Sequence, residues 1–251
     1  MRRWLTYELG GTPPFTIRLE ERETMDDQAV IIGNSDGIGL ALTRALLERS
    51  WAVRGLSRSA SPVEHASYQH TLVDVRKREF LDALGRVLDV GDTRLVIYCA
   101  GIGELFHTCR LADDIATFET NLMGLVRTVE CSLPHLLSRK SGTLVGLSSM
   151  ADVLRSKASP AYGASKAGMP HYLESIALAL RDTGVKIVNV RLGFVNTKMA
   201  KADFKLWILQ PEEVADRILR RVLTDSPPRR LNIPRRMAAL TGLAQFFASR
   251  L

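Results

Sequence analysis

The stretch AVIIGNSDGIG, residues 29–39, decides the fold of the chain, because an apolar run ends in closely spaced glycines. Its first four residues are apolar, as expected of a strand buried on both faces of a parallel sheet. Gly33, Gly37 and Gly39 follow, and the amphipathic pattern of a helix begins at once. Glycines let a phosphate approach the backbone, and a helix N-terminus supplies N–H donors. The stretch therefore predicts a phosphate-binding loop, with Gly-x-x-x-Gly-x-Gly spacing in place of the commoner Gly-x-Gly-x-x-Gly.

Apolar runs and helical patterns alternate along the rest of the chain. Beyond 29–32, the predicted strands are 52–56, 71–75, 94–100, 143–149, 185–192 and 229–233. The predicted helices are 37–49, 76–89, 113–139, 160–182 and 211–223. Strands that alternate with helices imply a parallel sheet covered on both faces. We therefore predict an α/β fold, a doubly wound parallel sheet with helices on both faces, in a single domain over residues 27–251.

The two ends of the chain differ from this core. Residues 1–26 carry mixed charge and no convincing period, and we interpret them as an N-terminal extension. For residues 234–251 we predict an amphipathic C-terminal helix in which an apolar stripe follows Arg235 and Arg236. Such a helix fits either a membrane interface or a surface of this domain or of another subunit.

Composition limits the class of protein. The 251 residues are 46% hydrophobic and 24% charged, which is ordinary for a folded soluble chain. There is no apolar run long enough for a membrane span, and the N-terminus lacks the apolar core of a secretory signal. Three cysteines without CxxC spacing predict neither disulfides nor a metal site, and they favour the cytoplasm. The net charge of +7 favours anionic partners, but no nucleic-acid-binding motif is present.

Tyr162 and Lys166 stand four residues apart in the segment AYGASKAG, where the intervening residues are small. Residues i and i+4 of a helix share one face, and a cation beside a phenol favours the phenolate. The pair is therefore suited to proton exchange near neutral pH, although a Tyr-x-x-x-Lys pair also arises by chance on surface helices.

Several further motifs occur in a fixed order: GNSDGIG at 33–39, Asp74 closing the third strand, CAG at 99–101, TNLMG around Asn121, GLSS before Tyr162, and RLGFVNTKM at 191–199. Over residues 28–235 the chain resembles the short-chain dehydrogenases/reductases, nicotinamide-dependent oxidoreductases built on the Rossmann fold. It departs from the family pattern at Ile32, Tyr98, Cys99 and Leu192, which replace a threonine, two asparagines and a proline.

The resemblance implies a catalytic set of Asn121, Ser149, Tyr162 and Lys166. Ser149 is preferred to Ser148 because it lies thirteen residues before the tyrosine, the usual family separation. In these roles Ser149 donates to the substrate oxygen and Tyr162 is the general acid or base. Lys166 lowers the tyrosine pKa and bonds the nicotinamide ribose, and Asn121 holds a water that connects Lys166 with solvent.

The resemblance also implies the residues that hold the cofactor. They are Gly33, Asn34, Ser35, Asp36, Gly37, Ile38, Gly39, Ser57, Arg58, Asp74, Val75, Ala100, Gly101, Tyr162, Lys166, Gly193, Val195 and Thr197. An acidic residue after the second strand would select NAD(H), whereas an arginine suits the 2′-phosphate of NADP(H). Ser57 and Arg58 at this place favour NADP(H) over NAD(H), whereas Asp36 argues the other way and Arg58 could also be a solvated loop residue.

The family places its substrate lid at residues 198–210, where lysines and apolar residues would occupy opposite faces of a helix. With Arg155 and Lys157 they form a basic rim, which fits either a solvated mobile lid or an anionic or lipid-linked substrate. The family further implies a homo-oligomer, a dimer or tetramer, that pairs the helices predicted at 113–139 and 160–182. Their apolar residues include Leu122, Leu125, Val126, Val129, Leu173, Ile176 and Leu180.

These observations favour an NADPH-preferring oxidoreductase that transfers a hydride between the nicotinamide and a small carbonyl or secondary alcohol substrate. Peripheral membrane contact remains compatible with the sequence. The alternative is a catalytically silent NADP-binding sensor or scaffold, which is supported by the altered residues on the cofactor side.

Overall fold

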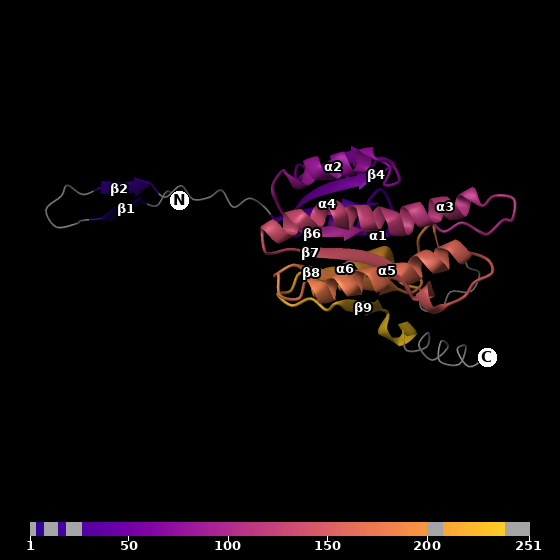
Figure 1. Cartoon of the computed structure of the whole chain (residues 1–251). Coiled ribbons are helices and arrows are strands. Elements are labelled where there is room, and N and C mark those ends of the chain that lie inside the picture. Colours follow the sequence, from indigo (N-terminus) through magenta and orange to yellow (C-terminus); the bar gives the residue numbers. More distant parts are fainter. Residues whose placement is uncertain (1–3, 8–14, 19–26, 200–207, 239–251) are drawn as a thin grey trace.

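The computed structural model describes residues 27–199 and 208–238, and also the backbone of β1 (Trp4–Tyr7) and β2 (Phe15–Arg18). Its core is a seven-stranded, parallel sheet in the order β5-β4-β3-β6-β7-β8-β9 (Figure 1). The strands are β3 (Asp27–Ile32), β4 (Ala52–Ser57), β5 (Tyr68–Leu72), β6 (Asp92–Tyr98), β7 (Thr143–Ser149), β8 (Lys186–Leu192) and β9 (Arg230–Ile233). The strand order reverses between β3 and β6, so their carboxyl ends open a crevice there.

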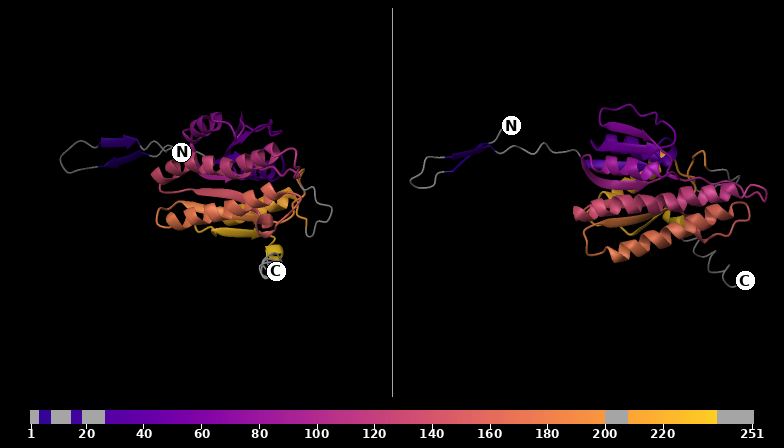
Figure 2. Two further views of the ribbon diagram at one scale, coloured as in Figure 1. Left: turned by 45° about the vertical axis from the view of Figure 1, so that its right-hand side comes forward. Right: turned by 45° about the horizontal axis from the view of Figure 1, so that its top comes forward.

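Helices cover both faces of this sheet. On one face lie α1 (Gly37–Leu47) and α6 (Pro211–Val222), and on the other lie α2 (Glu79–Leu88), α4 (Gly124–Ser138) and α5 (Pro160–Ala179), as Figure 2 shows from two directions. Alternate residues of β3 divide between the two cores: Ala29 and Ile31 pack with α1 and α6, whereas Val30 and Ile32 pack with α2 and α4. Burial on both faces explains why the strand is apolar throughout.

The predicted Rossmann-type single domain is confirmed, with two local corrections. The strand predicted at 71–75 lies at 68–72, so Asp74 follows β5 and does not close it. β5 is a half-exposed edge strand, and an apolar run is therefore a poor guide to its bounds. The helix predicted at 113–139 is divided into α3 (Ala112–Phe118), the π-helical turn η1 (Glu119–Met123) and α4.

Two segments at the ends of the chain bear on further predictions. Within residues 1–26, where no regular element is predicted, β1 and β2 pair in an antiparallel, two-stranded sheet. At four residues each, they are too short for periodicity to reveal. The predicted C-terminal helix begins at residues 235–238. Its remainder, 239–251, and lid residues 200–207 lie outside the described part of the chain.

A buried ion pair joins three segments near the carboxyl edge of the sheet. Arg191 of β8 donates to both oxygens of Asp152, from Nε at 2.6 Å and from Nη2 at 2.5 Å. Both side chains are less than one-tenth exposed. Asp152 belongs to the 3-10 turn η2 (Met150–Val153) directly after β7, and Arg191 also donates to Asn232 of β9. The pair therefore ties the chain after Ser149 to the two strands beside it.

Removing one partner of this ion pair should lower the free energy of unfolding far more than removing both. Asp152→Ala leaves a guanidinium buried without its counter-ion, and we expect a loss of about 3–5 kcal/mol in the free energy of unfolding. The double variant Asp152→Leu/Arg191→Met leaves no uncompensated charge and should lie much closer to wild type. Urea unfolding of the three proteins measures the difference. A single variant that loses less than about 1 kcal/mol, as an exposed pair would, contradicts this assignment.

Candidate active site

The glycine loop folds tightly at the carboxyl end of β3. Gly33 has φ +85°, and a Cβ there would lie 2.5 Å from the backbone nitrogen of Ala100, the second residue after β6. A Cβ on Gly39 would lie 2.1 Å from the Gly33 carbonyl oxygen. Gly37, with φ +53°, lies beside Thr197. Glycine at these positions is therefore required by the approach of β6, of α1 and of the segment after β8.

The loop's polar side chains have different surroundings. Asn34 is fully buried, and its Nδ2 donates to the Tyr68 hydroxyl at 2.7 Å and to Thr43 at 3.3 Å. Its side chain therefore supports the loop from inside, and its backbone is what remains for a ligand. Ser35 is half-buried, Asp36 is exposed, and Ile38 packs partly against the α1–α6 core.

The ends of β4 and β5 bring a second set of predicted residues together. The Arg76 guanidinium donates to both Asp74 oxygens and is the main cause that holds the pKa of this carboxyl below its usual value. Arg58, which is exposed just after β4, lowers this pKa further. Ser57 is buried and donates to the Ser59 carbonyl at 2.7 Å, so it stabilises the loop that carries Arg58. The side chain of Val75 lies in the core.

The four predicted catalytic residues converge where β6 and β7 end. Ser149 closes β7 and hydrogen-bonds with Tyr162 of α5, and the Lys166 ammonium lies 5.9 Å from the centre of the tyrosine ring. A Cβ on Gly101 would be 3.4 Å from Asn121 Oδ1 and 3.7 Å from Lys166 Nζ, so both groups flank one point of the chain. The motifs that are far apart in sequence thus meet beside the glycine loop.

The two serines before the tyrosine have separate partners. Ser148 is buried and donates to Asn189 Oδ1 at 2.5 Å, which occupies its hydroxyl within the sheet. Ser149 instead faces Tyr162, accepts from the backbone N–H of Ala151, and makes only a long hydrogen bond of 3.5 Å to the Leu192 carbonyl. This geometry supports the choice of Ser149.

The pKa shifts of Tyr162 and Lys166 differ from the prediction of a lowered tyrosine pKa. Burial raises the pKa of Tyr162 and outweighs the lowering by its hydrogen bond with Ser149. Burial also lowers the pKa of Lys166 to about 8, and its ammonium donates to the Leu147 carbonyl at 2.8 Å. The expected lowering of the tyrosine pKa by Lys166 is therefore not met, because desolvation acts on both groups and the ammonium bonds elsewhere.

Asn121 holds a loop against the tyrosine. Its Nδ2 donates to the Ile102 carbonyl at 2.9 Å and to Ser165 Oγ at 3.0 Å, and its Oδ1 accepts from the Ile102 N–H at 2.8 Å. The next turn of this loop brings Gly103 against the ring, where a Cβ would lie 3.1 Å from Tyr162 Cδ2. The sequence analysis did not predict a role for Ser165, although its position directly before Lys166 could have indicated one. The predicted water-holding role of Asn121 stays a prediction.

The segment after β8 closes the crevice from the other side. The Gly193 N–H donates to the Ile233 carbonyl at 2.8 Å, and a Cβ there would lie 2.4 Å from Met237 Sδ. Val195 is buried and bridges to Leu209. Lys198 forms an exposed ion pair with Asp36 at 3.6 Å, which joins this segment to the glycine loop.

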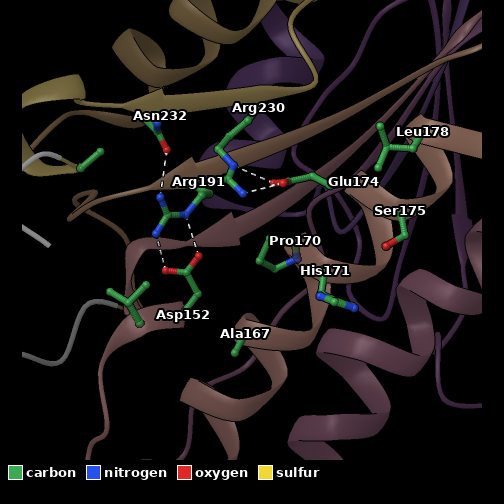
Figure 3. A pocket seen from close by; sticks show the side chains of 12 residues that line it. Asp152, Ala167, Pro170, His171, Glu174, Ser175, Leu178, Arg191, Arg230 and Asn232 are labelled. Atoms are coloured by element: carbon green, nitrogen blue, oxygen red, sulfur yellow. Dashed lines mark hydrogen bonds and ion pairs between the residues drawn. The ribbon is translucent and has the colours of Figure 1, made fainter. Parts of the chain in front are cut away.

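A pocket of about 720 Å³ lies along another flank of α5 (Figure 3). Asp152, Glu174, Arg191 and Arg230 line it and pair with one another, Glu174 with Arg230 and Asp152 with Arg191. The four predicted catalytic residues are not among its described lining residues. Because its charges are already compensated, we place the candidate active site at the crevice and not in this pocket.

The lowered pKa of Lys166 predicts a pH-dependent contribution to stability. Between about 8 and the ordinary value of 10.5, the unfolded chain binds more protons than the folded one, so stability from this group rises with pH. The free energy of unfolding of wild type should rise relative to Lys166→Met over this range, by at most about 1.4 kcal/mol per pH unit. Denaturant titrations from pH 7 to 10 measure this, with Lys77→Met as an exposed control. Parallel curves for wild type and Lys166→Met would contradict the prediction.

Comparison with known proteins gives the family. The family model described as short chain dehydrogenase matches residues 27–205. An uncharacterized oxidoreductase of Myxococcus xanthus is 30% identical over 229 residues, which cover 84% of this chain and 90% of that protein.

Two solved structures show the shared fold. A short-chain dehydrogenase from Streptomyces avermitilis has a TM-score of 0.74 at 20% identity, covering 90% of this chain and 94% of that one. The closed form of serine dehydrogenase complexed with NADP+ has a TM-score of 0.73 at 19% identity, covering 82% and 93%. With the family model spanning most of the sequence, the chain belongs to the short-chain dehydrogenase family of oxidoreductases.

Proposed function

We propose that this protein is an NADPH-preferring oxidoreductase that transfers a hydride between the nicotinamide and a small carbonyl or secondary alcohol substrate. The observation that carries the proposal is the convergence of Ser149, Tyr162 and Lys166 beside the glycine loop. The loop fits a dinucleotide, because its glycines bring bare backbone to the N-terminus of α1 at the strand-order reversal. A bound nicotinamide supplies or accepts the hydride.

The chain's own residues manage the charge and the proton. As negative charge develops on the carbonyl oxygen, the Ser149 hydroxyl donates a hydrogen bond to it. Tyr162 delivers its phenolic proton to the same oxygen, or removes it in the oxidation direction. The raised pKa of Tyr162 suits it to hold this proton until the alkoxide forms, and we assign Lys166, 5.9 Å from the ring centre, to the nicotinamide ribose. Loop 101–103, held by Asn121, packs on the ring and limits its movement.

Loss of the Tyr162 hydroxyl should slow turnover strongly. With NADPH and a panel of ketones, aldehydes and keto-sugars, wild type should oxidise NADPH steadily, while Tyr162→Phe should lose about 100- to 10,000-fold in kcat with its general acid. Tyr172→Phe, a change on the same helix in a partly buried tyrosine, is the matched control and should retain activity. Tight NADPH binding without turnover by wild type on the whole panel would instead favour the silent sensor or scaffold.

The NADPH preference rests on Arg58. The exposed guanidinium follows the buried Ser57 where an NAD-selecting carboxylate would stand, and the serine dehydrogenase of similar fold is described with NADP+. Asp36 opposes an anionic ligand, but its ion pair with Lys198 offsets that charge. We therefore assign recognition of the 2′-phosphate to Arg58.

Removing this guanidinium should change cofactor preference. Losing a charge-assisted bond to a phosphate costs about 1.5–3 kcal/mol, so Arg58→Ala should weaken NADPH binding about 10- to 150-fold and NADH binding far less. Titration of both cofactors measures the ratio, and Arg49→Ala, an exposed arginine that pairs with Asp216, is the control. Equal losses for the two cofactors would exclude Arg58 from this role.

An anionic or lipid-linked substrate would suit the basic rim. Arg155 and Lys157 are exposed in the loop before α5, and Lys198 is exposed after β8. The lid lysines Lys201 and Lys205 lie outside the described residues. Among the described helices, none is long and apolar enough to cross a bilayer. Membrane contact and a cytoplasmic location stay predictions.

Pairing of α4 and α5 with a second copy remains our proposal for assembly. Leu125, Val129 and Leu173 are buried in the domain's own core and are therefore removed from the predicted interface. Leu122 and Val126 instead line a groove of about 570 Å³ between these helices, together with Tyr172.

A further inference from the structure

Tyr98 is a core residue whose hydroxyl makes a hydrogen bond that apolar packing alone does not require. It is the last residue of β6 and is fully buried between the sheet and α4. Its hydroxyl donates to the backbone carbonyl of Thr120, which lies in the π-helical turn η1. A phenylalanine would fill the same space without this bond. The hydroxyl is therefore the feature that needs explanation.

The π-turn supplies the acceptor. In an α-helix the Gly124 N–H would bond to residue 120, four positions earlier. Here it bonds to Glu119, five positions earlier. The Thr120 carbonyl is thus released from its helical partner, and the Tyr98 hydroxyl takes that partner's place. A buried carbonyl or hydroxyl left unpaired is costly, so the phenol and the π-turn stabilise each other.

Gly124 leaves the room for this contact. A Cβ on Gly124 would lie 2.1 Å from the Tyr98 hydroxyl oxygen and 3.0 Å from Val75 Cγ2. A glycine inside a helix is unfavourable by about 1 kcal/mol relative to alanine, so its presence here needs a compensating contact. The phenol is that contact. Tyr98, the π-turn and Gly124 therefore form one unit.

The unit decides where Asn121 points. Asn121 is the residue after Thr120 in the same turn, and its amide clasps both the N–H and the carbonyl of Ile102. If the Gly124 N–H returned to Thr120, the residues before it would rotate by about 100° relative to α4. Asn121 would then lose Ile102 and Ser165.

We propose that Tyr98 is a positioning residue for the active site, which acts through the Thr120 carbonyl and the π-turn to fix Asn121 and, through it, loop 101–103 on Tyr162. This inference rests on the proposed function for its catalytic consequence. Its structural consequence, the hold of Asn121 on Ile102, does not depend on any reaction. Burial raises the pKa of Tyr98, so the donor stays protonated across the working range.

Tyr98→Phe removes the hydroxyl alone and is the first variant. Misplacing a reacting constellation by about 1 Å costs up to about 100-fold, so kcat should fall about 10- to 100-fold while the KM for NADPH is unchanged. Asn121→Ala should show a similar loss. Because both changes act on one path, the double variant should be no slower than Asn121→Ala alone. Tyr172→Phe controls for loss of a tyrosine hydroxyl.

Hydrogen exchange of the intact chain gives a readout independent of activity. The Ile102 amide, which donates to Asn121 in wild type, should exchange faster in Tyr98→Phe and stay protected in Tyr172→Phe. Should wild type show no turnover on any substrate, the proposed function fails, and the Ile102 amide still decides this inference.

Gly124→Ala is the second variant, and it tests the same proposal if Tyr98→Phe does not fold. It keeps the phenol but drives it from the Thr120 carbonyl, so it should reproduce both the loss of kcat and the faster Ile102 exchange. Full kcat with a protected Ile102 amide in either folded variant overturns the proposal. The proposal is also overturned if, in the double variant, the loss of kcat from Tyr98→Phe adds in full to the loss from Asn121→Ala.

Discussion

A parallel sheet has two faces to bury, and the rest of this structure depends on that constraint. β3 directs Ala29 and Ile31 to one side and Val30 and Ile32 to the other, so helices must follow on both faces. Connections that leave a central pair of strands in opposite directions open a crevice at the carboxyl edge. Gly33 allows the chain to pass within contact distance of Ala100 there, and this narrow passage lets the glycine loop and the catalytic residues share one edge.

Sequence patterns predicted the parts of the molecule that follow from this constraint. Strands buried on both faces, such as β3 and β7, are apolar throughout and are found within two residues of their bounds. The bounds of β5 were not predicted correctly, because this edge strand is not buried on both faces. The π-turn at 119–123 was not predicted either, because it is stabilised by a tertiary contact from Tyr98, which is far away in sequence. The motif positions of Ser149, Tyr162 and Lys166 could be predicted, whereas their pKa shifts arise from burial, which no spacing reveals.

Desolvation has opposite effects on the two titrating groups of the candidate site. It raises the pKa of Tyr162 and lowers the pKa of Lys166 to about 8, so the two values, which are ordinarily close, move apart. A neutral phenol is the form required to give a proton to a developing alkoxide, which is the role we propose for Tyr162. The same burial makes the lysine a cost to folding, since a buried ammonium is destabilising unless it is bonded. The Leu147 carbonyl offsets part of that cost and also fixes where the ammonium lies.

The four residues that depart from the family pattern lie mostly in the packed core of the sheet. Ile32 and Tyr98 are fully buried and face the α2–α4 side of the sheet, whereas Leu192 is buried in the core on the opposite face. Cys99 is near Lys166, but burial raises the pKa of its thiol, so it remains neutral and does not compete for the ammonium. These substitutions therefore alter the packing behind the site, while the groups that would touch the reacting oxygen keep their partners. A chain that had become a mere sensor has no need to keep a bonded ammonium buried beside a phenol, and this argues for an enzyme.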